Sequence, residues 1–304
     1  KFLFLVLLLI AFIIIDLTHF STDWNLLSIL IPQFRMPRTL VVLIAGTALA
    51  MAGFIIQTVV DNPLADAGTL GITSGASAGA VLFLFISQWL KLSGTWIFMY
   101  PLFALLGAVF SFALLYHLAL RKNVSNIQVL LIGLGITALF QALITLAQLS
   151  INRFDFQQVA VWLSGDIWQT DKAFIGLTFV LLIIGLLFFS LIRKELDLLS
   201  LGQEMATSLG LNVKKSKMQF YILALLFASI GVLLVGGLAF IGLIAPHIAR
   251  ELVGFESKKR ALTTALVSMI ILLLADSLSQ IIIAPSSLPL GFVVALIGAP
   301  YYIY

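Results

Sequence analysis

The sequence predicts an all-α integral membrane protein that forms one domain over residues 1–304. Hydrophobic residues make up 62% of the chain and charged residues only 10%, against roughly 25% charged in an ordinary soluble domain. The mean hydropathy is +1.16. Uncharged runs long enough to cross about 30 Å of hydrocarbon as a helix recur along the whole length. This composition excludes a soluble enzyme and a nucleic-acid-binding domain.

The predicted spans follow the charge-free runs in order. The first apolar run, Phe2–Ile15, is interpreted as a membrane helix, because no small-residue cleavage site of a signal peptide follows it. The run Met218–Ala249 is too long for one span and is divided at Gly236–Gly237, and the last segment is divided near residues 284–287. We predict about ten transmembrane helices, at about 2–17, 36–60, 68–90, 97–120, 126–150, 172–193, 217–238, 240–254, 260–283 and 289–304.

Lysine and arginine residues predict the orientation, because cytoplasmic loops carry an excess of them. If the N-terminus is cytoplasmic, twelve of the 17 basic residues lie inside. The bias therefore predicts an even number of spans with both termini in the cytoplasm. The longest cytoplasmic segment is then about 194–216, which is amphipathic. It predicts two short helices that are separated by Gly202 and end at Gly210.

Catalytic and metal-binding patterns are missing from the sequence. It has no cysteine, no phosphate-binding G-x-x-x-x-G-K-[ST] loop and no H-E-x-x-H metal motif. His247 is expected to be structural, since one histidine without neighbouring ligands is a poor iron site. We predict no enzyme activity, no metal site and no cofactor bound by this chain.

Asp276 is taken as the one ionisable residue inside a predicted span, about 24 Å along its helix from Arg260. Such a position favours capping or ion pairing near the outer interface. A secondary transporter needs ionisable residues in the middle of the membrane to carry its coupling proton or sodium ion, and a single peripheral carboxylate does not meet this need. The energy for transport is therefore expected from another subunit.

Several motifs occur in a fixed order along the chain. They are R-x-P-R from Arg35, G-x-x-L-A-x-x-G-x-x-x-Q over Gly46–Gln57, the block from Asn62 to Ala76, WLSG at Trp162–Gly165, and GLAFIGLIAPHIARELVG over Gly237–Gly254. An Ala-Asp pair at 275–276, followed by LPLGFVVALIGAPYYIY, completes the set. Together they resemble the FecCD/BtuC-type permease family, the membrane subunits of ABC importers for iron–siderophores, haem and cobalamin.

The resemblance implies a BtuC-like type II importer fold of ten helices. It implies four kinds of partner: a second permease (the same or a related chain), two ATPase subunits that bind ATP and Mg²⁺, an extracytoplasmic substrate-binding protein and membrane lipid. The location implied is the plasma or inner membrane of a bacterium. The block DNPLADAGTLGITSGA is nearest to ferric-hydroxamate permeases. Haem or cobalamin is the alternative within the family; an ATP-independent secondary transporter or channel, or a membrane scaffold, is the alternative outside it.

By resemblance, Arg35 and Arg38 dock acidic residues of the binding protein at the outer mouth, which suits the bidentate chemistry of arginine. The alternative is that they snorkel at the interface. Gln280 stands where the family often has a further arginine. The cytoplasmic segment resembles the family's coupling helices, with Glu204, Ala206, Leu209 and Gly210 at recurrent positions, and would contact the ATPase. The alternative is an amphipathic helix lying on lipid.

A polar stripe runs along the predicted helix at 126–150. Thr137, Gln141, Thr145 and Gln148 share one helical face of an otherwise apolar segment. Because polar groups in lipid find partners or water, the stripe should face the bundle interior or a pore. By resemblance, this helix lines the translocation path. Hydrogen bonding between helices is the alternative.

Overall fold

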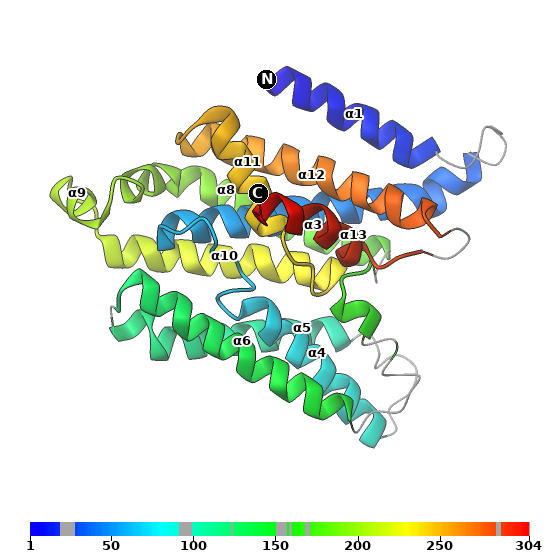
Figure 1. The fold of residues 1–304 in the computed structure, drawn as a ribbon, viewed down its shortest axis with the longest axis horizontal. Coiled ribbons are helices and arrows are strands. Elements are labelled where there is room, and N and C mark those ends of the chain that lie inside the picture. Colours follow the sequence, from blue (N-terminus) through cyan, green and yellow to red (C-terminus); the bar gives the residue numbers. More distant parts are fainter. Residues whose placement is uncertain are drawn as a thin grey trace.

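A computed structural model describes residues 1–18, 28–90, 99–122, 124–149, 157, 160–167, 171–283 and 287–303, and every regular element within them is helical (Figure 1). The elements in chain order are α1 (Phe2–Thr18), η1 (Ile31–Arg35), α3 (Met36–Val60), α4 (Ile72–Trp89), α5 (Tyr100–Leu118), η3 (Leu120–Lys122), α6 (Asn126–Gln148), α8 (Lys172–Leu199), α9 (Gln203–Ser208), α10 (Val213–Val235), α11 (Ile241–Val253), α12 (Ser257–Ile281) and α13 (Leu290–Ile303).

Each of the ten predicted spans has a counterpart among the described helices, and the short elements η1, η3 and α9 are additional. Six are long and apolar enough to cross a membrane, namely α3 together with the helical residues 28–35 before it, α5, α6, α8, α10 and α12. Shorter apolar helices are α1, α4 and α13, and α11 has 13 residues. The prediction of an all-α membrane fold with about ten helices is confirmed.

Helix α3 is the central helix of the bundle, between α10, α11, α12 and α8 (Figure 1). Its most apolar stretch is 89% buried, whereas that of α5, α6 and α8 is 28% buried. Small residues allow this central position, because they let neighbouring backbones approach closely. A Cβ on Gly53 would lie 1.8 Å from the carbonyl oxygen of Gly242 in α11. Helix α1 lies at the edge, against α12.

Helices α4, α5 and α6 form a second group beside the first (Figure 1). Glycines again bring two helices together: a Cβ on Gly79 of α4 would lie 2.1 Å from the Phe103 oxygen of α5, and one on Gly107 would lie 2.2 Å from the Gly75 oxygen. The second group contacts the first mainly through α10. Helix α6 therefore has one packed face and one broad exposed face.

Several helix ends differ from the prediction, and two of the differences have a visible cause. Helix α4 begins at Ile72 rather than at 68, because residues 66–69 form a turn in which Asp66 Oδ1 accepts the Thr69 N–H at 2.8 Å. Helix α8 continues to Leu199, beyond the predicted end at 193. The segment about 194–216 therefore holds one separate short helix, α9, instead of two. Gly202 and Gly210, both with positive φ, bound α9 as predicted.

Candidate functional site

Arg38 and Asp276 form an ion pair at the end of the bundle that the charge bias predicts to face outward. Arg38, on α3, donates from Nη2 to Asp276 Oδ1 at 2.8 Å and from Nε to both carboxylate oxygens at 3.0 and 3.1 Å. Gln280 donates from Nε2 to Asp276 Oδ2 at 2.9 Å. The Asp276 side chain is fully buried, whereas that of Arg38 is 27% exposed. The pairing interpretation of Asp276 is therefore confirmed, with Gln280 as a second donor.

Asp16 is a second carboxylate inside a membrane helix, and the expectation that Asp276 is the only one is wrong. Asp16 is buried in α1. Its Oδ2 accepts the Thr39 hydroxyl of α3 at 2.6 Å, and its Oδ1 accepts the Ser277 hydroxyl of α12 at 3.2 Å. Arg35 ties α1 to the same end by donating to the Leu17 carbonyl at 2.6 Å. Three helices are thus joined by polar contacts at this end.

Asp166 adds a further carboxylate near the Arg38 pair. It lies in the loop after Trp162, where its Oδ1 accepts the Ile167 N–H at 2.8 Å. Burial raises the pKa of the Asp166 carboxyl and the charge of Asp276 adds to this effect, while the Ile167 bond and Arg38 act in the opposite direction. The sequence analysis did not select Asp166, although it directly follows the WLSG motif.

The polar stripe of α6 divides into two parts. Thr137 is partly buried, and its hydroxyl lies 2.9 Å from the Gly68 carbonyl, an acceptor in the loop between α3 and α4. Gln141 and Thr145 are exposed at the surface of this chain, and the Thr145 hydroxyl donates to the Gln141 carbonyl at 2.9 Å. Gln148 is partly exposed. Thr137 thus bonds between segments, while the rest of the stripe faces away from the chain's own core.

Helix α9 projects beyond the ends of the long helices (Figure 1). Ala206 is fully buried and anchors α9, while Glu204 is exposed. The apolar side chains of Met205 and Leu209 are 55% and 56% exposed. Gly210, at φ +86°, ends the helix in a conformation that a side chain would strain. Helix α9 is therefore held to the bundle by Ala206 and exposes the apolar side chains of Met205 and Leu209 beside the charge of Glu204.

The described residues contain no cluster of three or more potential metal ligands. The ring of His247 packs edge to face against the Tyr301 ring at 5.8 Å. This contact agrees with a structural role for His247.

Comparison with known proteins gives a consistent result. The profile of the FecCD transport family matches residues 2–304. The iron(3+)-hydroxamate import system permease protein FhuG of Bacillus subtilis is 40% identical over 90% of this chain and 82% of its own length. The vitamin B12 import system permease protein BtuC of Pectobacterium atrosepticum is 36% identical, over 90% of this chain and 80% of its own. A solved inward-facing conformation of a metal-chelate type ABC transporter superposes with a TM-score of 0.87 at 26% identity, covering 99% of this chain and 96% of that one.

Proposed function

Because the chain belongs to the FecCD transport family, as a permease subunit of an ABC importer, we propose that it carries an iron(III)–hydroxamate complex. The support is the 40% identity to a permease named for that substrate. Cobalamin is the second candidate, because a permease named for vitamin B12 import is 36% identical. The proposed setting is a bacterial plasma or inner membrane, with both termini in the cytoplasm.

The exposed part of the α6 stripe carries the proposal for the translocation path. Gln141 and Thr145 face outward from a helix that is otherwise apolar and long enough to span. Polar groups in that position need polar or aqueous surroundings. A second permease, identical or related, would enclose a path against this face. Uncharged amides and hydroxyls suit a bulky polar chelate that must pass without binding tightly.

Arg35 and Arg38 are proposed to dock the substrate-binding protein. The Nε edge of Arg38 is already engaged by Asp276, so a carboxylate of the binding protein would approach the other edge of the guanidinium. Arg35 uses Nη1 on a backbone carbonyl and keeps further donors. Both arginines are thus held in place by this chain before any partner arrives, which limits the entropy lost on docking.

Helix α9 is proposed to couple this chain to a separate ATPase that holds ATP and Mg²⁺. Its buried Ala206 connects it to the bundle, and the exposed Leu209 and Met205 supply an apolar contact. Glu204 contributes to the charged rim. A short helix that enters a groove on a partner needs this combination.

Substrate and partners are tested together with a tagged chain expressed in its native membrane. The proposal predicts that an ATPase and a permease copy or relative purify with it, and that deleting the gene abolishes uptake of radioactive iron supplied as a hydroxamate complex. Loss of cobalamin uptake alone would select the second candidate. Purification without an ATPase, in a detergent that keeps known importers whole, would contradict the coupled mechanism.

The path is tested with Gln141→Glu. A carboxylate on the proposed path should reduce iron uptake at least tenfold while the partners still purify with the chain, since Gln141 is exposed and supports no core packing. Gln141→Asn keeps the amide and should retain uptake. Normal uptake by the Gln141→Glu variant would remove this side chain from the path.

A further inference from the structure

Two carboxylates of α8 tie together the helices on either side of α9. Helix α9 lies between α8 and α10 in the chain and contacts both. The buried hydroxyl of Ser216, in α10, donates to Glu195 Oε2 at 2.5 Å. The backbone N–H of Ser257, at the start of α12, donates to Asp197 Oδ1 at 2.8 Å. A displacement of α9 should therefore move the adjoining ends of α8, α10 and α12 together.

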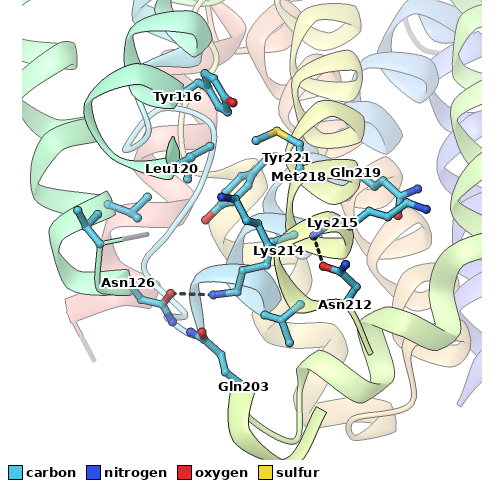
Figure 2. A pocket seen from close by; sticks show the side chains of 14 residues that line it. Tyr116, Leu120, Asn126, Gln203, Asn212, Lys214, Lys215, Met218, Gln219 and Tyr221 are labelled. Carbon is cyan, nitrogen blue, oxygen red and sulfur yellow. Dashed lines mark hydrogen bonds between the residues drawn. The ribbon is translucent and has the colours of Figure 1, made fainter. Parts of the chain in front are cut away.

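A cavity of about 680 Å³ lies between these helix ends and the second helix group (Figure 2). Its walls come from the end of α5, the start of α6, Gln203 of α9 and the first turns of α10. Close packing resists the sliding of one helix past another, and across a cavity that resistance is missing. At this end of the bundle, movement of α10 therefore reaches α6 only through a contact that bridges the cavity walls.

Lys217 makes such a contact. It lies one turn into α10, directly after Ser216, and its Nζ donates to Asn126 Oδ1 at 3.1 Å (the dashed line from Asn126 in Figure 2). Asn126 is the first residue of α6. A hydrogen bond from an ammonium group is stronger than one between neutral groups. Lys214 also lines the cavity, but its ammonium group has no hydrogen bond or ion pair within the described residues.

The loop between α3 and α4 holds α6 near its middle. A Cβ on Gly133 would lie 2.5 Å from the Thr69 carbonyl oxygen, so the two backbones are in close contact. One turn further along, the Thr137 hydroxyl lies 2.9 Å from the Gly68 carbonyl. Asn126 is about 10 Å from Gly133 along the helix. A straight helix that is held near its middle tilts about that place when its first turn is displaced.

We propose that the contact between Lys217 and Asn126 transmits the movement of α9 to α6, which makes both side chains positioning residues for transport. The proposal rests on the proposed function, in which α9 contacts an ATPase and Gln141 lies on the path. Gln141 is about 12 Å beyond Gly133 along α6. A tilt of α6 about the Gly133 contact therefore shifts Gln141 about as far as Asn126, in the opposite direction.

The test uses the complete transporter in lipid vesicles, with this chain, its partner permease, the ATPase and the binding protein. ATP hydrolysis and uptake of radioactive iron(III) supplied as a hydroxamate complex are measured in the same sample, which gives the iron transported per ATP. Lys217→Met removes the donor at similar volume, and Asn126→Ala removes the acceptor. Asn126→Asp keeps an acceptor for Lys217. Lys214→Met is the matched control, because it removes a lysine from the same helix and cavity.

We expect the iron transported per ATP to fall about tenfold in Lys217→Met and in Asn126→Ala, while the ATPase still purifies with the chain and hydrolyses ATP. The double variant should be no worse than either single variant, because both changes remove the same contact. Asn126→Asp and Lys214→Met should behave like the unmodified chain.

An unchanged ratio in both single variants would overturn the proposal. Losses that multiply in the double variant, or a fall in ATP hydrolysis that matches the fall in uptake, would also overturn it, because a merely structural role gives these results. The unmodified transporter tests the proposed function separately. If it takes up labelled cobalamin instead of iron, the substrate proposal fails, and the cobalamin transported per ATP then tests the contact in the same variants.

Discussion

Gly53 offers a sharp test of how α3 and α11 pack. A Cβ added there would lie 1.8 Å from the Gly242 carbonyl oxygen and 2.5 Å from its carbon. Carbon contacts have their optimum at roughly 3.5 Å or more, so Gly53→Ala must separate the two backbones by about 1.5 Å. Gln57, one turn further along α3, donates to the carbonyls of Gly242 and Leu243 at 3.3 and 3.2 Å. That separation would break both hydrogen bonds.

The size of the effect follows from these contacts. Overpacking costs about 1–3 kcal/mol, and each lost hydrogen bond inside a membrane bundle costs about 0.6 kcal/mol. Replacing a glycine inside a helix by alanine raises the free energy of unfolding by about 0.5–1 kcal/mol, because alanine loses less backbone entropy on folding. The free energy of unfolding should therefore fall by about 1–4 kcal/mol, which lowers the thermal midpoint by roughly 2–6 °C for a chain of 304 residues.

The assay is thermal unfolding of the purified transporter, with Gly176→Ala as the matched control. Gly176 lies in α8, and a Cβ there would meet nothing within 4 Å. Its substitution should leave the midpoint unchanged or raise it slightly. Equal midpoints for the Gly53 and Gly176 variants would refute the close contact between α3 and α11.

Three further experiments test charged side chains. Asp276→Asn leaves the Arg38 guanidinium without its carboxylate. It should lower the free energy of unfolding by about 2 kcal/mol, less than the about 3–5 kcal/mol of a fully buried pair, because the Arg38 side chain is 27% exposed. Adding Arg38→Gln should recover part of this loss in a double-mutant cycle, and strict additivity would contradict the pairing. Burial raises the pKa of the Asp66 carboxyl in the folded chain, although its hydrogen bonds act in the opposite direction. Ionisation of Asp66 therefore lowers the free energy of unfolding as the pH rises above about 4. Asp66→Asn should therefore gain thermal stability relative to the unmodified chain as the pH is raised from 4 to 7, and a constant difference would contradict this. Arg260 is 7% exposed, stacks on an aromatic ring and forms no ion pair within the described residues; Arg260→Met should keep the unfolding midpoint or raise it, and a large fall would contradict this.

The helices were predictable from the sequence wherever apolar runs end at turn-forming residues. The bounds of α3 agree with the prediction, because charged residues and Asn62–Pro63 flank a long apolar run. The prediction for α8 was wrong because the apolar run stops at Arg193 while the helix continues to Leu199. Asp197, in that last turn, accepts the backbone N–H of Ser257 at 2.8 Å. This stabilising partner is far away in the sequence and gives no local signal.

The candidate site was predictable only residue by residue. Arg38 and Asp276 were both selected, but their pairing joins positions 238 residues apart, which no local pattern indicates. Asp16 was missed because one carboxylate near the end of an apolar run resembles an interfacial residue. Its burial depends on hydroxyls from α3 and α12, which only the packed structure brings together.

The arrangement of the helices bears directly on how ATP hydrolysis could reach the substrate. The proposed coupling helix α9 contacts α8 and α10 of the first group, whereas the proposed path lies on α6 of the second group. Lys217 to Asn126 is a single polar link between the groups, and Thr137 bonds to Gly68 in the loop that joins them. Within each group, glycine-mediated backbone contacts leave little room for adjustment. We therefore expect a displacement of α9 to move one rigid group against the other rather than to deform either group.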